Sequence, residues 1–190
     1  MTLSELEEII NERPSLRGII SGFLAEYKVK KMWFSDPRIT EVGRFSDHDR
    51  EHKSDLVVTY GGHPITVQVK SLQSNSVKSD GETWTGKFQC DASDKRNVRL
   101  PNGSTLETTC LVIGGFDLLA VNLFEFGREW RFAFARNKDL PRSTFKKYPP
   151  RQRKYLLATL MDVSWPLEEP YEPEPYHLLD EIIGEKRGKT

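Results

Sequence analysis

The sequence has few cysteines, no long apolar run and no leader-like start. Its two cysteines, Cys90 and Cys110, match no metal-ligand spacing, which excludes a disulfide-rich scaffold and favours a reducing compartment. No apolar run approaches the roughly 18 residues that a membrane-spanning helix needs, so we expect no contact with a membrane. Residues 1–5 lack the basic and then apolar layout of a secretory signal peptide. Together these absences predict a cytoplasmic protein.

The chain also lacks net charge, because 28 lysines and arginines balance 28 aspartates and glutamates. This balance argues against a protein coated in positive charge, but the two signs are segregated along the chain. Residues 131–154 hold nine basic residues and one acidic residue, a net charge of +8, with aromatic residues between them. Residues 157–182 hold seven acidic residues and no lysine or arginine, a net charge of −7. The basic block is expected to attract a polyanion.

A chain of 190 residues, 37% hydrophobic and 29% charged, fits one globular domain. We expect a single domain over residues 1–190, with a core at about 15–161 and a C-terminal extension at 162–190. Ser4 and Glu7 have the spacing of a capping box for a first helix, and Pro14 suits the start of a second. That second helix has an apolar stripe at helical spacing, made of Leu16, Ile19, Ile20, Phe23, Leu24 and Tyr27.

Strand patterns fill the middle of the chain. Residues 55–60 and 65–70 are rich in β-branched residues and predict a hairpin across a glycine-containing turn. Residues 35–54 read as irregular. Further strands are expected at 85–90, 98–100, 105–108, 110–113, 118–124 and 130–135. A helix is expected at 150–161, then a proline-rich extended segment at 165–176 and a short helix at 178–183.

The predicted hairpin gathers three polar side chains on one face. If Tyr60 pairs with Ile65, then Asp55 lies opposite Lys70, and Asp55, Gln68 and Lys70 project from the same face. The other face is apolar. A carboxylate and an amide oxygen suit a hard cation such as Mg²⁺, and a lysine beside them can orient water or offset charge on a phosphate. The pattern therefore indicates metal-assisted hydrolysis of a phosphodiester.

These residues resemble the signature of the PD-(D/E)XK nuclease superfamily, an Asp on one strand and Glu-x-Lys on the next. Asp55 stands for the first element, and Gln68 and Lys70 form a Gln-x-Lys variant similar to that of Mrr-like restriction nucleases. The resemblance implies an α/β fold with an α-β-β-β-α-β core, a mixed sheet flanked by helices, followed here by the acidic, proline-rich C-terminal segment. It also implies that Glu26, on the helix before the hairpin, is a third metal ligand.

The activity that follows is that of a Mg²⁺-dependent DNA endonuclease, with Mn²⁺ as the alternative ion, of a restriction or defence type. A cutter of duplex DNA is expected to work as a homodimer, because two symmetric sites match the two strands. Two departures keep a second reading open. Ser54 occupies the place of the family's proline, and Gln68 is neutral, which favours a nucleic-acid-binding module that kept the nuclease fold without activity.

Candidate DNA contacts lie after the hairpin and in the basic block. Arginine is preferred, because its guanidinium matches both phosphate and guanine. The candidates are Lys87, Arg96, Arg99, Arg142, Lys146 and Lys147. A third reading is a protein-interaction domain that uses the acidic tail. His48 and His52, with three acids between or beside them, have a zinc-like spacing but no helical pattern, so a solvated loop is favoured there.

Overall fold

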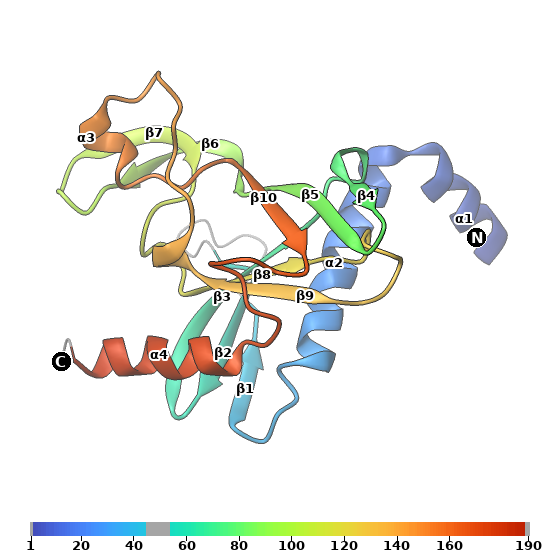
Figure 1. The fold of residues 1–190 in the computed structure, drawn as a ribbon, viewed down its shortest axis with the longest axis horizontal. Helices are drawn as coiled ribbons and strands as arrows, with labels where there is room; N and C mark the ends of the chain where they lie inside the picture. Colours follow the sequence, from blue (N-terminus) through green and yellow to red (C-terminus); the bar gives the residue numbers. More distant parts are fainter. Residues whose placement is uncertain (1, 45–53, 189–190) are drawn as a thin grey trace.

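The chain folds around a five-stranded mixed sheet, seen here in a computed structural model that describes residues 2–44 and 54–188 (Figure 1). The strand order is β1-β2-β3-β8-β9. These strands are β1 (Ile39–Gly43), β2 (Leu56–Tyr60), β3 (His63–Ser71), β8 (Leu118–Asn122) and β9 (Phe132–Arg136). β3 and β8 run parallel, and the other neighbours are antiparallel. The expected α/β class with a mixed sheet is therefore confirmed.

The two faces of this sheet are buried in different ways. Leu118 and Ala120 of β8 pack with α2 (Pro14–Met32) and α4 (Tyr176–Arg187) in one apolar cluster. Leu119 and Val121, which alternate with them, pack in a second cluster with side chains of β5 (Thr83–Gln89) and β10 (Leu160–Trp165). β8 is buried at every residue, as a strand covered on both faces must be. Helices thus cover one face, and strands cover the other.

The connection from β3 to β8 differs from the expected core. Residues 72–117, all of them described, contain no α-helix, although the family pattern has one at this point. Four strands make the connection instead, after the 3₁₀ turn η1 (Ser74–Ser76): β4 (Lys78–Asp80), β5, β6 (Asp91–Arg99) and β7 (Thr105–Cys110). β4 and β5 join β10 in a three-stranded sheet, and β6 pairs with β7.

The helix predicted at 150–161 is wrong beyond Arg153. α3 spans only Pro150–Arg153, and β10 begins at Leu160 and pairs with β5 over its whole length. Leu156 packs instead against the β6–β7 pair, where the Tyr148 hydroxyl also bonds Thr108 Oγ1 at 2.8 Å. We call residues 91–110 and 141–156 the lobe, because they share this small core apart from the main sheet (Figure 1).

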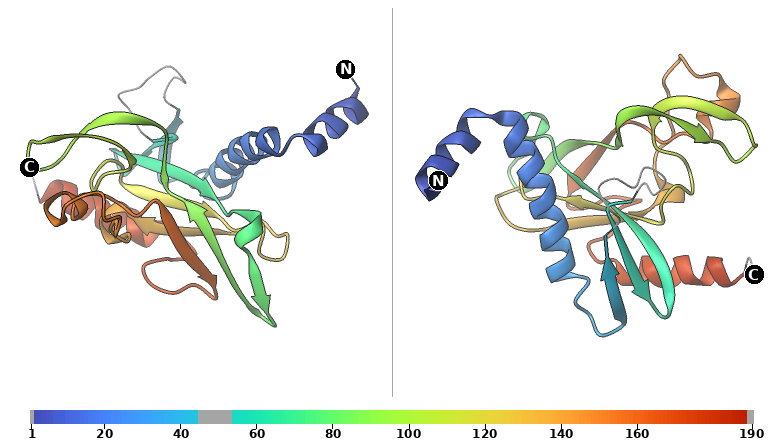
Figure 2. Two further views of the ribbon diagram at one scale, coloured as in Figure 1. Left: turned by 90° about the horizontal axis from the view of Figure 1, so that it is seen from above. Right: turned by 180° about the vertical axis from the view of Figure 1, so that it is seen from behind.

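We call the two N-terminal helices the arm: the first projects from the body, and the second packs on the sheet through Ala25 and Val29 (Figure 2). α1 (Leu3–Glu12) begins with a capping box made by Thr2 and Glu5, two residues before the predicted pair Ser4 and Glu7. α2 begins at Pro14 as predicted. Neither these helices nor any other in the described ranges is long and apolar enough to span a membrane.

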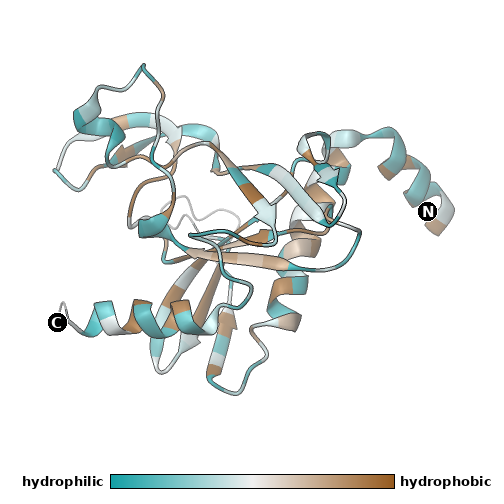
Figure 3. Ribbon diagram, viewed as in Figure 1, coloured by the Kyte–Doolittle hydropathy of each residue, from teal (hydrophilic) through white to brown (hydrophobic). Residues whose placement is uncertain are grey.

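The C-terminal helix is longer than predicted and closes the sheet. α4 docks through two tyrosines: Tyr60 of β2 donates to Asp180 Oδ1 at 2.9 Å, and Tyr176 donates to the Trp33 carbonyl at 2.9 Å. Apolar colouring is concentrated in the central strands, which α4 helps to cover (Figure 3). β1, which lies in the stretch predicted to be irregular, pairs with β2 along its exposed edge. The 3₁₀ turn η2 (Asn137–Asp139) follows β9.

Candidate active site

The β2–β3 hairpin brings Asp55 and Gln68 face to face. Tyr60 pairs with His63 rather than Ile65, because Gly61 and Gly62 both have positive φ and make a two-residue turn. The register therefore differs by two residues from the predicted one, and Asp55 lies opposite Gln68 instead of Lys70. Side chains alternate with a period of two, so this shift leaves the same residues on the same face.

The Asp55 carboxylate is held by two donors at the start of β2. Gln68 Nε2 donates to Asp55 Oδ2 at 2.6 Å, and the backbone N–H of Val69 donates to the same oxygen at 2.7 Å. Burial raises the pKa of Asp55, and the Val69 N–H, the charges of Lys70 and Arg44, and the Gln68 amide oppose that rise. The carboxylate is thus desolvated and attracts a cation more strongly than a surface aspartate does.

Gln68 has a buried carbonyl oxygen that lacks a partner. Its side chain is 4% exposed, and among the described residues no donor reaches its Oε1 atom. The amide cannot turn over, because the Asp55 oxygen requires the N–H group on its own side. An unsatisfied buried acceptor costs about 1–3 kcal/mol. A hard cation beside Asp55 would remove that cost, so the oxygen ligands present fit Mg²⁺ or Mn²⁺.

Lys70 lies one alternation further along the same face of β3. It is half-buried, and its Nζ donates to the Asp91 carbonyl at 3.3 Å. The neighbouring Cys90 thiol feels the charges of Lys70, Asp91 and Asp55, and its burial raises its pKa to about 12. The charged groups of Lys70, Asp91 and Asp55 therefore lie close to Cys90, the residue that links β5 to β6.

Asp91 is a site residue that the sequence did not single out. Its carboxylate accepts from Gln89 Nε2 at 3.1 Å, and it lies half-buried beside Lys70. An aspartate at the end of a strand pattern is also typical of an ordinary turn. The sequence therefore contains no signal that separates it from the other polar residues after β5.

Glu26 lies on α2 and pairs with an arginine. Arg44 Nε is 3.5 Å from Glu26 Oε2, and the Glu26 side chain is 18% exposed. Because Arg44 also attracts the Asp55 carboxylate, it links the two acids electrostatically. The described residues contain no cluster of three or more His, Cys, Asp or Glu side chains able to hold a metal ion. The metal role of Glu26 stays a prediction.

The residues predicted to contact DNA lie on different elements, and some of them already pair with groups of the protein. Lys87 lies on β5 and pairs with Asp162 of β10 at 3.3 Å. Arg142 donates to the backbone carbonyls of Lys138, at 2.5 Å, and Leu140. Its guanidinium is therefore engaged by the preceding turn of its own chain. Lys146 and Lys147 are exposed in the lobe.

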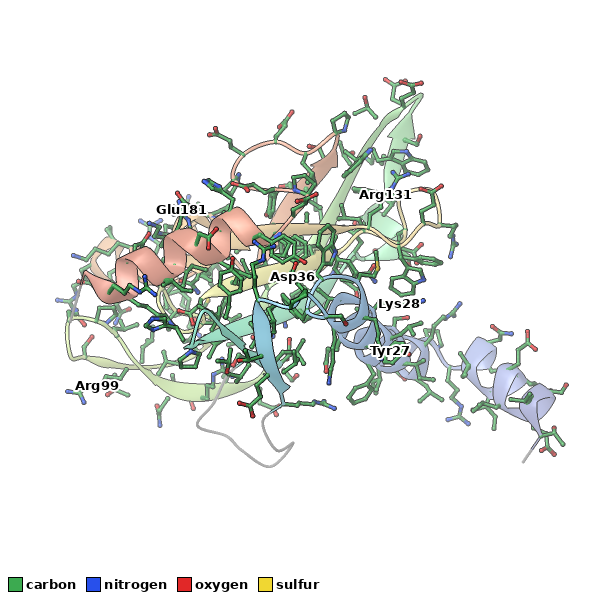
Figure 4. The ribbon with its side chains drawn as sticks, turned by 90° about the horizontal axis from the view of Figure 1, so that it is seen from below. Tyr27, Lys28, Asp36, Arg99, Arg131 and Glu181 are labelled. Carbon is green, nitrogen blue, oxygen red and sulfur yellow. The ribbon has the colours of Figure 1, made fainter. Side chains whose placement is uncertain are left out.

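Arg96 and Arg99 differ more sharply than their closeness in β6 suggests. Arg99 is exposed at the edge of the lobe (Figure 4). Arg96 is half-buried, and its Nε and Nη2 atoms are covered without a hydrogen-bond partner among the described residues. Burial also lowers the pKa of Arg96. Of the two arginines, Arg99 is therefore the more accessible to a phosphate.

The basic block divides into two parts. The part nearest β9 is neutralised, because Arg136 pairs with Asp139 and Glu181 at 2.6 Å each, and Lys138 pairs with Glu185. The acidic tail thus folds back on this part through α4. The part in the lobe stays exposed, at Lys146, Lys147, Arg151 and Lys154. The tail therefore offers less free acidic surface to a protein partner.

The histidine cluster of the sequence, with His48 and His52, lies outside the described residues.

Comparison with known proteins gives one structural likeness. No family model matches the chain, and no curated protein matches it. Among solved structures, one titled "The structure of a bacterial homing endonuclease: I-Ssp6803I" aligns with 20% identity and a TM-score of 0.36, over 75% of this chain and 87% of that one. At this identity and TM-score no fold or activity is transferred from it. The side chains of the site itself therefore carry the functional assignment.

Proposed function

We propose that this protein is a metal-dependent endonuclease that hydrolyses phosphodiester bonds of duplex DNA. The observation that carries the proposal is the buried Oε1 of Gln68, which has no partner among the described residues, beside the desolvated Asp55 carboxylate, with Lys70 on the same face. The same three residues carry the resemblance to the PD-(D/E)XK nucleases. Its Gln-x-Lys form favours a restriction or defence role in the cytoplasm.

Each residue has a separate task in this proposal. Asp55 and Gln68 would hold Mg²⁺ or Mn²⁺ through their side-chain oxygens, and Glu26 would become a third ligand if a phosphate displaced it from Arg44. When bound, such an ion would supply acidification of the attacking water and compensation of charge on the phosphate. Lys70 directs its ammonium at the phosphate or at the attacking water. Water adds to phosphorus and gives up a proton to solvent, one P–O ester bond breaks, and the leaving oxygen takes up a proton.

The lobe supplies cations for the DNA backbone in the same proposal. Arg96, Arg99, Lys146 and Lys147 lie in the lobe, two of them on the β6–β7 pair that begins beside Lys70. Phosphate contacts hold a nucleic acid in place without reading its sequence, and their strength falls steeply with salt.

Plasmid cleavage tests the proposal. The purified chain is incubated with supercoiled plasmid in Mg²⁺, in Mn²⁺ and in EDTA, beside Lys70→Ala and a matched control, Lys78→Ala. Lys78 is an exposed lysine of β4, so its loss removes the same charge away from the site. We expect nicked and linear product with either metal, none in EDTA, and loss of cleavage only for Lys70→Ala. Cleavage that survives Lys70→Ala would contradict the assignment.

The second candidate is an inactive module that binds nucleic acid. The neutral Gln68 favours it, because an amide contributes no negative charge to a cation site. Binding of labelled duplex DNA without cleavage in either metal would select this function. In both cases the affinity is expected to fall with salt and to weaken when Lys146 and Lys147 are changed to alanine.

A further inference from the structure

The arm made of α1 and α2 presents an apolar surface that the rest of the described chain leaves uncovered. Its largest exposed side chains are Ile19, Phe23 and Tyr27, which are 58%, 49% and 55% exposed. They recur at helical spacing, so they lie on one side of α2. α2 buries only Ala25 and Val29 against the sheet. Figure 4 labels Tyr27 on α2, toward the side from which α1 extends.

α1 adds an energetic argument for a missing neighbour. None of its ten residues, all of which are described, is buried. A helix of that length is marginal in water by itself, because most helical stability comes from packing an amphipathic face. Leu3, Leu6, Ile9 and Ile10 give α1 such a face. The capping box at Thr2 stabilises only the first turn.

The charges of the arm indicate what covers it. α1 holds four glutamates and no lysine or arginine, at Glu5, Glu7, Glu8 and Glu12. The far end of α2 is basic, with Lys28, Lys30 and Lys31. The apolar stripe lies between these ends. Suppose that the arm of a second chain packs antiparallel on the first. The acidic α1 of each chain then meets the basic end of α2 of the other, and the two apolar stripes face each other.

We propose that the arm is a homodimer surface, in which α1 and α2 of two chains pack antiparallel about a two-fold axis. Such an interface is self-complementary, as a two-fold axis requires, because each acidic end meets the partner's basic end. α1 and α2 span about 15 Å and 28 Å at 1.5 Å per residue, long enough for several turns of contact. The pairing does not depend on the proposed activity, and its test contains no DNA.

Charge exchange at the two ends tests the pairing. One variant of the full chain, Glu8→Lys with Glu12→Lys, makes the acidic end basic; both positions are exposed and lie past the first turn, where lysine suits the helix dipole. A second variant, Lys30→Glu with Lys31→Glu, makes the basic end acidic at exposed positions. Sedimentation equilibrium over a range of concentrations measures the dissociation constant, and circular dichroism checks that helix content is kept.

We expect the wild-type chain to dimerise and each variant to raise the dissociation constant by about tenfold, since attractive pairs become repulsive. An equimolar mixture of the two variants should dimerise as tightly as wild type, because each end again meets its opposite charge. Ile19→Ser with Phe23→Ser should abolish the dimer. A wild-type chain that stays monomeric at every concentration overturns the proposal, as does a dimer that the charge exchanges leave unchanged or a mixture that fails to restore it.

Discussion

The two faces of the β2–β3 hairpin have opposite properties over the same few residues. On the helix-covered face, Leu56, Val58, Ile65 and Val67 are buried in a continuous apolar cluster. On the other face, Asp55 and Gln68 are almost as well covered, yet Asp55 carries a charge and Gln68 an oxygen that no donor of residues 2–44 or 54–188 reaches. The apolar face stabilises the fold, and the polar face costs stability. That cost is expected where a protein prepares a binding site.

The largest effect should come from Asp55→Asn. The amide keeps an oxygen for the Val69 N–H but loses the charge that attracts the cation, so we expect plasmid cleavage to fall about a thousandfold or more. Stability should move the other way. The folded-state pKa of Asp55 is raised, so the stability of wild type declines as pH rises through that pKa, while the variant escapes the decline.

Thermal melts of both proteins across pH separate these effects. The melting temperatures should coincide below the ordinary aspartate pKa, and the variant should be the more stable at pH 8. Added Mg²⁺ should raise the melting temperature of wild type alone. A variant that is less stable than wild type at pH 8 would mean that Asp55 supports the fold rather than a ligand.

Val67→Ala tests the other face. Val67 is fully buried, so removing two methyl groups should cost about 2 kcal/mol of unfolding free energy in urea titrations. Val57→Ala is the matched control, since Val57 is the same residue type, half-exposed on the polar face of the hairpin. Equal losses of unfolding free energy at the two positions would contradict the claim that only the apolar face stabilises the fold.

Gln68→Glu should sharpen the contrast by introducing the carboxylate that the PD-(D/E)XK signature has at this position. Without metal, a second acid beside Asp55 should destabilise the fold by about 1 kcal/mol or more, because like charges are buried together. With Mg²⁺ the variant should gain more in melting temperature than wild type does. Gln68→Leu, which has no oxygen, is the control and should gain nothing. A response of Gln68→Leu equal to wild type would place the ion elsewhere.

The smallest effect concerns Cys90, the buried thiol behind Lys70. Its pKa of about 12 and full burial predict no reaction with a thiol reagent at pH 8 in the native protein. Cys110 is 2% exposed and should be equally silent. Both thiols should react in denaturant, which serves as the control. Rapid native labelling would show that the corner between β5 and β6 opens to solvent.

The sequence predicts correctly which side chains share the polar face of the hairpin, because a register error of two residues does not change side-chain alternation. A shift of two residues moved the partner of Asp55 from Lys70 to Gln68 and left the polar face unchanged. The helix expected at 150–161 failed for a tertiary reason. Leu160 fits a helical period, but it begins β10, which pairs with β5 some 70 residues earlier in the chain. β1 has too short and exposed a pattern to be distinguished from a loop.

Contacts between segments that are far apart in the chain could not be predicted from the sequence. Arg44 lies between Glu26 and Asp55 because α2, β1 and β2 converge, and nothing in the local pattern around Arg44 indicates this. The same holds for the tail. The charges of the tail do not indicate a partner, and its pairing with Arg136 and Lys138 rather than with the lobe follows from where α4 docks.

The parallel pairing of β3 with β8 has a consequence for the order of folding. The pair joins segments far apart in the chain, as the bond from Asn122 Nδ2 to Ser71 Oγ across 51 positions illustrates. A hairpin such as β2–β3 forms from neighbouring residues, whereas a long chain must close before β8 can pair, and such closures slow folding. We therefore expect Asp55 and Gln68 to meet early on an open hairpin. Their burial should follow later, once β8 has paired with β3 across the long connection.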